Sequence, residues 1–178
     1  ILDPDNNYVL IIDEMNRGNL PKIFGELMYS LEYRNDNDSQ FAMSLQYSEE
    51  KINLANNIYF IGTMNTADRS IRSIDIALRR RFIFWDLWPD VDILKKFYQR
   101  DENNNDLGDD LFNKFTQLNE RLTNDIDKHH QIGHSFFMSK DLTKLKVTNT
   151  WNRQIKPLLD EYFYDRPDLR EDYSNPFN

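Results

Sequence analysis

The sequence contains no cysteine, few glycines and no long apolar run, and each absence excludes a class of protein. Without cysteine the chain can form neither a disulfide nor a cysteine-ligated zinc site. A membrane-spanning helix needs about 18 apolar residues in a row, and no apolar stretch of the sequence is that long. The net charge of −8 over 178 residues also excludes a generally basic surface. Any contact with nucleic acid must therefore be local or carried by another domain.

The five glycines are too scattered to form a phosphate-binding loop. No G-x-x-x-x-G-K-[ST] motif occurs, and this motif binds nucleotide phosphates through backbone N–H groups and a lysine. The first residues, Ile1 to Pro4, have no signal-peptide character and no initiator Met. We therefore expect a segment of a longer protein that binds nucleotide weakly or not at all by itself.

The chain does contain enough apolar sequence for a core, at 39% hydrophobic residues. The runs Tyr8–Ile12 and Ile58–Gly62 are continuously apolar and partly β-branched, a pattern typical of parallel strands buried on both faces. Phe82–Leu87 is a third strand candidate. An intervening polar stretch contains two short pieces, Phe41–Leu45 and Lys51–Leu54, that suit a β-hairpin.

Two helices are predicted among these strands. Asn19 can cap the first, and apolar residues continue along one of its faces as far as Leu31. A shorter helix starts at Ser73 and runs to Leu78, just before three arginines. Strands that alternate with helices indicate an α/β fold with a parallel sheet.

The second half of the chain has only the helical period. Apolar residues three and four apart predict helices over 91–98, 111–126 and 151–163, the last interrupted near Pro157. The chain after about Leu169 is expected to be loose. The predicted domains are an α/β core at 1–88, an all-α lid at 89–170 and a tail at 171–178.

Polar side chains follow two of the predicted strands. Asp13 and Glu14 end the first strand, and Asn65 comes just after the second. Ligand sites in parallel sheets lie at the carboxyl ends of the strands, so these side chains converge if the strands are neighbours. One carboxylate could then hold Mg²⁺ through water while the other deprotonates an attacking water. The alternative is structural, because strands end in polar residues and Asn is common in turns.

Three consecutive arginines, Arg79, Arg80 and Arg81, close the second helix. Cations at a helix C-terminus complement its dipole, which is the structural interpretation. Guanidinium groups at this position could also reach the nucleotide of a neighbouring subunit as arginine fingers. Arg69, which follows Asp68, could act similarly or pair with a carboxylate.

The combination of these motifs resembles the McrB-type AAA+ proteins, the GTP-driven motors of methylation-dependent restriction. VLIIDEMNRGNLPKIFGEL is similar to the Walker B segment of that family, and IYFIGTMNTADRS resembles its Met-Asn-x-x-Asp-Arg-Ser signature. IDIALRRRF is similar to its arginine-finger segment, and IGHSFFM and IKPLLDEYF to its lid. The resemblance runs from about Tyr8 to Phe163. It implies a partial AAA+ P-loop-type parallel sheet with helices, followed by an all-α lid.

The resemblance also implies roles for individual residues. Asp13 would be the Walker B residue that holds Mg²⁺, and Glu14 the catalytic base. Asn65 would be the sensor-1 residue. Asp68 and Arg69 would belong to the signature loop at the nucleotide and the subunit interface.

By the same resemblance, Arg80 and Arg81 would act in trans on the nucleotide of the next subunit, while Arg79 is left as structural. The full-length protein would hydrolyse GTP, or alternatively ATP, in a homo-oligomeric ring that is expected to be a hexamer. A McrC-like nuclease subunit would be its partner, and DNA would bind through regions absent from this sequence. The implied location is the prokaryotic cytoplasm, with no membrane partner.

Two other functions stay open at this point. The missing phosphate-binding loop would suit a non-hydrolysing protein-assembly module. A MoxR-like AAA+ chaperone that uses ATP shares the strand-DE pattern and an arginine finger, although MNTADRS with ALRRRF is not expected there. His129, His130 and His134 lie close together in sequence, but their spacing matches no metal-ligand pattern, and a loop or lid role is favoured.

Overall fold

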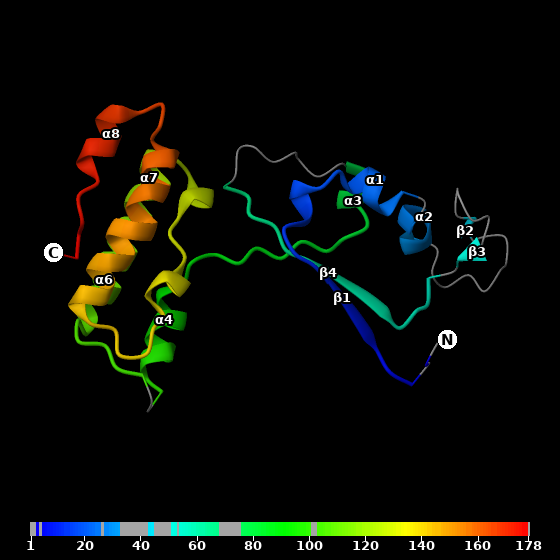
Figure 1. Cartoon of the computed structure of the whole chain (residues 1–178), viewed down its shortest axis with the longest axis horizontal. Coiled ribbons are helices and arrows are strands. Elements are labelled where there is room, and N and C mark those ends of the chain that lie inside the picture. Colours follow the sequence, from blue (N-terminus) through cyan, green and yellow to red (C-terminus); the bar gives the residue numbers. More distant parts are fainter. Residues whose placement is uncertain are drawn as a thin grey trace. The chain divides into compact units, whose positions relative to one another are not determined.

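The computed structural model divides the chain into two compact units, Ile1–Trp85 and Asp86–Asn178, which are described separately (Figure 1). The structure describes residues 3, 5–25, 27–32, 43–44, 51–52, 54–67, 76–100 and 103–177. Among these residues no helix is both long and apolar enough to cross a membrane. The predicted domain bounds at 88 and 170 stay predictions.

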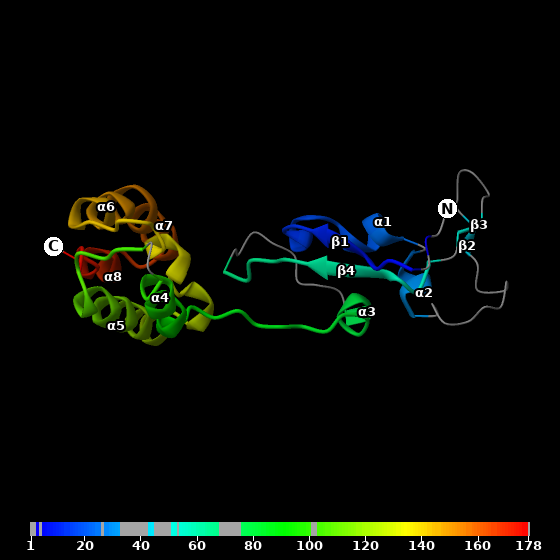
Figure 2. The same ribbon diagram turned by 90° about the horizontal axis from the view of Figure 1, so that it is seen from below.

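The first unit contains a parallel pair of strands, β1 (Tyr8–Ile12) and β4 (Ile58–Gly62). They run side by side in both views (Figures 1 and 2), with Tyr8 opposite Ile58 and Ile12 opposite Gly62. The two runs are therefore neighbouring parallel strands, which is the condition on which the convergence of Asp13, Glu14 and Asn65 depends.

The prediction that both strands are buried on both faces is wrong for the residues described. Val9 is 54% exposed, Ile11 66% and Tyr59 50%. The described part of this sheet has only two strands, so each strand keeps an unpaired edge and much of its side-chain surface stays accessible.

The third strand candidate, Phe82–Leu87, is also a wrong prediction. No described strand pairs with this segment. Ile83, Trp85 and Leu87 are 95%, 85% and 90% exposed. A short apolar run can favour a strand, but a strand's ladder hydrogen bonds need donors and acceptors from a neighbouring strand.

One predicted helix is two in the structure, α1 (Leu20–Phe24) and α2 (Leu27–Glu32). Asn19 caps α1 as predicted, because its side-chain oxygen accepts a hydrogen bond from the Lys22 N–H at 3.3 Å. Gly25 ends α1 with a φ of 43°, a left-handed value that glycine adopts without steric cost.

Two further predicted elements are only partly within the described residues. The helix expected from Ser73 is seen as α3 (Ile76–Arg79), and its expected start lies outside the described residues. The hairpin pieces are seen as β2 (Met43–Ser44) and β3 (Lys51–Ile52), and their antiparallel pairing is confirmed.

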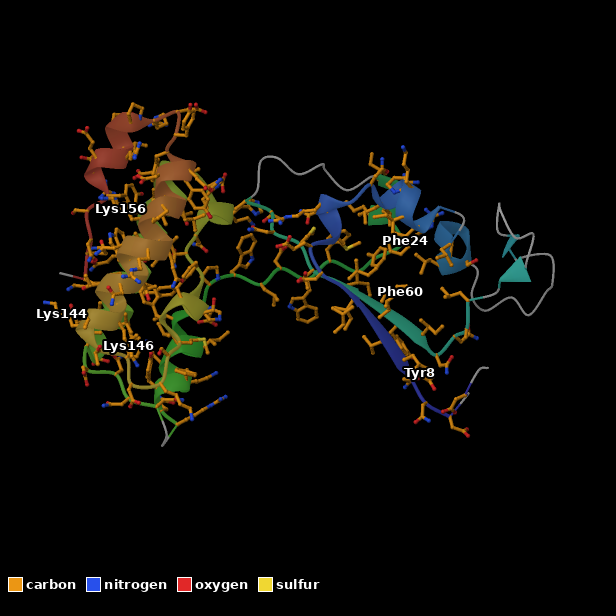
Figure 3. All side chains as sticks on the ribbon, viewed as in Figure 1. Tyr8, Phe24, Phe60, Lys144, Lys146 and Lys156 are labelled. Carbon is orange, nitrogen blue, oxygen red and sulfur yellow. The ribbon has the colours of Figure 1, made fainter. Side chains whose placement is uncertain are left out.

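A small core joins the helices of this unit to β4. Phe24 packs edge-to-face on both Phe60 and Phe82, with ring centroids 6.2 Å apart in each pair. Figure 3 labels Phe24 and Phe60 on α1 and β4. Leu78 of α3 is fully buried in the same cluster. This cluster holds the strand pair and the arginine-bearing helix α3 together.

The second unit is all-α, as the helical period predicts. Its elements are α4 (Val91–Tyr98), α5 (Asp109–Asp125), the short 3-10 helices η3 (Lys128–His130) and η4 (His134–Phe137), α6 (Lys144–Thr150), the π turn η5 (Trp151–Ile155), α7 (Lys156–Tyr162) and α8 (Pro167–Asp172). The helices enclose one core that includes the fully buried residues Leu94, Leu122 and Trp151.

The interruption predicted near Pro157 takes the form of the π turn η5, which joins α6 to α7 so that the three elements follow one another without a gap. The Lys156 N–H donates to the carbonyl of Trp151, five residues back instead of four. Proline has no N–H, and its ring clashes with the carbonyl four residues earlier, so a wider turn before Pro157 accommodates it.

The loose tail predicted after Leu169 is wrong. Residues 167–172 form α8, and Tyr173 and Phe177 are 7% and 1% exposed. The Phe177 ring lies against Phe137 and Trp151. Figure 2 shows this C-terminal segment, in red, between α5 and α6. Two aromatic side chains buried in the core offset the entropy lost in ordering a short polar segment.

Candidate functional site

The carboxyl ends of β1 and β4 are joined by backbone hydrogen bonds that continue past the strands. The Thr63 N–H donates to the Ile12 carbonyl at 3.0 Å, and the Met15 N–H donates to the Thr63 carbonyl at 2.9 Å. A Cβ at Gly62 would lie 2.0 Å from Sδ of Met15, so a larger residue at this position would require the Met15 side chain to move. The two strand ends therefore converge.

Thr63 connects the carboxylate segment to the other strand through its side chain. Its hydroxyl donates to Oδ1 of Asp13 and accepts the Glu14 N–H at 3.0 Å. Thr63 was not among the site residues predicted from the sequence. The available signal was its position, since a hydroxyl directly after β4 stands opposite Asp13 in the parallel register. Asp13 is exposed, and no described residue bonds its Oδ2.

Glu14 has an unusual backbone, with a φ of 49° in the left-handed region. Few residues other than glycine adopt this conformation, and such strain is concentrated at functional sites. The Glu14 carboxylate forms an ion pair with Nε of Arg17 at 2.7 Å, and the Glu14 side chain is 45% exposed. The pair spans the short 3-10 helix η1 (Met15–Arg17).

Asn16, on η1, and Asn65, in the turn after β4, are joined by a hydrogen bond. Asn16 is 7% exposed, and its Nδ2 donates to the Asn65 carbonyl at 3.0 Å. Oδ1 of Asn65 accepts the Ala67 N–H at 3.1 Å, as expected for a turn. Asn65 is exposed, and its Nδ2 has no partner among the described residues. Asp68 and Arg69 lie outside the described residues.

The three arginines have three different environments. The Arg79 guanidinium lies 5.1 Å from the centre of the Phe84 ring, a cation–π contact. Arg81 forms an ion pair with Glu32 of α2 at 2.5 Å, and its side chain is only 20% exposed. Arg80 is exposed and has no ion-pair partner among the described residues. A surface cavity of about 410 Å³ is lined by Leu31, Glu32, Arg80 and Arg81.

The sequences of known proteins identify the family. The AAA domain model (dynein-related subfamily) matches residues 5–82, and the model of the McrB alpha-helical lid domain matches residues 110–170. The chain is 35% identical over 185 aligned positions to the "Type IV methyl-directed restriction enzyme EcoKMcrB subunit" of Escherichia coli strain K12, with 97% of this chain covered. The chain belongs to the McrB-type AAA+ proteins.

A second relative of this McrB-type chain also belongs to a restriction enzyme. The "Type II restriction enzyme BsuMI component YdiS" of Bacillus subtilis strain 168 is 26% identical over 166 positions, which cover 84% of this chain. The chain spans 40% and 45% of the lengths of these two relatives. The predicted fold class, an AAA+ α/β part followed by a helical lid, is confirmed.

Each of the three histidines of the McrB-type lid has a structural partner, and for His129 it is the Trp88 ring, whose centroid lies 5.3 Å from that of the imidazole. His130 is 5% exposed, and its Nδ1 lies 2.8 Å from Oδ1 of Asp127. Burial raises the pKa of Asp127, but the hydrogen bonds from His130 and from the His129 N–H outweigh it, and the net shift is downward. Nδ1 of His134 accepts the Asp90 N–H at 3.1 Å. Within the described residues no three His, Asp or Glu side chains are placed to hold a metal ion.

Proposed function

We propose that this chain carries the hydrolytic residues of a AAA+ nucleoside triphosphatase motor in a McrBC-like, modification-dependent DNA restriction system, with GTP as the expected substrate and ATP as the alternative. The observation that carries the proposal is the convergence of two strand ends, where Asp13 and Glu14 are joined through Thr63 to the turn that holds Asn65. Membership in the McrB-type family supports it.

In this proposal Glu14 is the general base. Its carboxylate accepts the proton of a water that attacks the γ-phosphate. The ion pair with Arg17 holds the carboxylate at one edge of the site before substrate arrives. Both partners are about half exposed, and such a pair contributes under about 1 kcal/mol, so little energy opposes its release.

The donor set at the strand ends fits Mg²⁺. Asp13 offers a hard oxygen ligand on an exposed carboxylate, and the Thr63 hydroxyl occupies only one of its two oxygens. Asp13 would hold the ion through its other oxygen or through water. When bound, Mg²⁺ neutralises charge on the phosphate oxygens. The hydrogen bond from Thr63 restrains the other oxygen of this carboxylate.

Asn65 would contribute its amide NH₂ group. The oxygen end of this amide is used by the Ala67 N–H, which leaves Nδ2 as a neutral donor for a phosphate oxygen or the attacking water. The bond from Asn16 to the Asn65 carbonyl fixes the turn relative to η1. Asp68 and Arg69 would complete the signature loop.

Arg80 is the stronger of the two arginine-finger assignments. It is exposed, whereas Arg81 is held by Glu32 and half-buried. Arg80 would therefore act on the nucleotide of the next subunit without first breaking an ion pair. Arg81 would reach that nucleotide only after leaving Glu32. This assignment requires a ring of subunits, and we propose a homo-hexamer. Its partner would be a McrC-like nuclease subunit, and DNA would be the polymer on which the motor acts.

The test is nucleotide turnover by the full-length protein carrying Glu14→Gln. GTP and ATP hydrolysis are measured side by side, and binding of each nucleotide is measured separately. We expect turnover to fall by about 100-fold or more, the scale of a general base, while binding persists. The matched control is Glu120→Gln, a similar change at an exposed lid position. Normal turnover by the Glu14 variant would refute the base assignment.

A further inference from the structure

The lid contains a segment whose charge is opposite to that of the whole chain. The net charge is −8, yet the residues from Leu142 to Leu159 include four cations and no carboxylate. The cations are Lys144, Lys146, Arg153 and Lys156, here called the basic lid patch. They lie on α6, η5 and α7 (Figure 3, which labels the three lysines).

The side chains of the basic lid patch are exposed to solvent, whereas other residues of α6, η5 and α7 are buried. Val147, Trp151, Ile155 and Leu159 recur every four residues and are buried in the lid core. All four cations of the patch are exposed. Arg153 is two residues from both Trp151 and Ile155, which turns it to the opposite side of the helix from the buried side chains. The four cations therefore lie on the surface of the lid, and Arg153 faces directly away from its core.

The patch also lacks the neutralising partners found elsewhere in the same unit. Lys114 pairs with Asp110 on α5, and Arg170 of α8 pairs with Asp160. In contrast, Lys144, Arg153 and Lys156 have no ion-pair partner within residues 103–177 or the other described parts of the chain. Lys146 donates to the carbonyl of Lys140 at 3.0 Å, which leaves its charge uncompensated.

We propose that the basic lid patch binds the phosphate backbone of duplex DNA. The exposed polar residues between the cations are Asn149, Asn152 and Gln154, whose amides donate hydrogen bonds readily to phosphate. The centre of a protein-binding surface is expected to be rich in aromatic residues and depleted of lysine, whereas this segment exposes three lysines and, among its large apolar side chains, Leu145. The inference rests on the proposed function only in taking DNA as the polyanion.

The basic lid patch is long enough to contact several consecutive phosphates of one DNA strand. Lys146 and Lys156 are ten residues apart, which corresponds to about 15 Å along a helix. Duplex DNA carries one phosphate per about 3.4 Å of each strand, so about four phosphates of one strand occupy that length. Contacts of this kind position the protein on DNA without reading its sequence.

The experiment measures binding of unmodified, non-specific duplex DNA to the full-length protein by fluorescence anisotropy, over a series of salt concentrations and without nucleotide. The variant is Lys146→Gln/Arg153→Gln/Lys156→Gln. Each lost phosphate contact lowers the slope of log K against log salt by about 0.9, so the expected reduction is about 2.7. A slope equal to that of the unmodified protein would overturn the proposal.

Two variants separate charge from structure. Lys95→Gln/Lys96→Gln/Arg100→Gln removes three exposed cations from the end of α4 and is expected to leave the slope nearly unchanged. Lys146→Arg/Lys156→Arg keeps the charge and is expected to keep the slope. An equal loss in the α4 variant contradicts the proposal, because it would mean a diffuse charge effect.

Other outcomes identify other partners. If the triple variant keeps its DNA slope but no longer assembles, as measured by light scattering, the patch contacts an acidic protein surface and the DNA proposal is wrong. Because nucleotide is omitted, Glu14→Gln should retain the full slope. A failed hydrolysis assignment and a failed DNA contact are therefore distinguishable.

Discussion

The two units differ in how completely each buries its own apolar side chains. In the lid, a continuous core buries Trp151, Phe163 and Phe177 to within 1% exposure. In the α/β unit, the strands that position the candidate site keep Val9 and Ile11 more than half exposed. Helices form all their backbone hydrogen bonds locally, whereas strands depend on neighbours that can be distant in sequence. The lid is therefore organised by local pattern, and the site by long-range pairing.

The largest expected effect contrasts two tryptophans. Trp151→Ala removes a fully buried ring and should destabilise the lid by about 3–5 kcal/mol. Trp85 is 85% exposed, so Trp85→Ala should change the free energy of unfolding by no more than about 0.5 kcal/mol. Denaturant unfolding of both variants checks this. Equal losses would mean that Trp85 is covered by something outside the described residues.

The next effect is on a buried amide of the lid. The Asn119 side chain donates to the Ile132 carbonyl at 3.0 Å and accepts its N–H at 2.6 Å. Asn119→Ala leaves both backbone groups buried without partners, and we expect a loss of about 2–3 kcal/mol. Thermal unfolding measures the loss, with the exposed Asn113→Ala on the same helix as control. A loss as small as that of the control would contradict this account.

A smaller effect on stability, but a clear one on turnover, is expected at the strand ends. Thr63→Val removes the hydroxyl that contacts Asp13 and the Glu14 N–H. The free energy of unfolding should fall by about 1 kcal/mol. Because the hydroxyl orients Asp13, turnover by the full-length protein should fall by about tenfold or more. Thr116→Val in the lid loses a comparable hydroxyl bond, to the Phe112 carbonyl. Equal turnover in the two variants would remove Thr63 from the site.

The smallest expected effect depends on pH. The pKa of Asp127 is lowered below the ordinary 3.8, so its charge stabilises the folded lid above that pH. The contribution is lost as the pH falls through the lowered pKa. Asp127→Asn should therefore cost under about 1 kcal/mol at neutral pH and almost nothing in acid below that pKa. Melting temperatures of both proteins across the acid range test this, and a constant difference would contradict it.

Much of the site was predictable because it depends on short, local patterns. Asp13, Glu14 and Asn65 each follow an apolar run, and the parallel pairing of β1 with β4 is enough to bring these segments together. Thr63, Asn16 and the Glu32–Arg81 pair were not predicted. Their partners are 49 or 50 residues away in sequence, and no periodicity links residues at that separation.

The sequence by itself determined the change from an α/β pattern to an all-α pattern, the helices of the lid and the acidic and amide residues that follow the strands. These depend on backbone hydrogen bonding within a few residues and on the spacing of apolar side chains. Only the tertiary structure decided that Phe82–Leu87 is not a strand, that Phe177 is part of the lid core and that Arg81, unlike Arg80, is held by a carboxylate. The reason is physical, because a strand, a buried aromatic ring and an ion pair each need a partner that the chain brings close only when it folds.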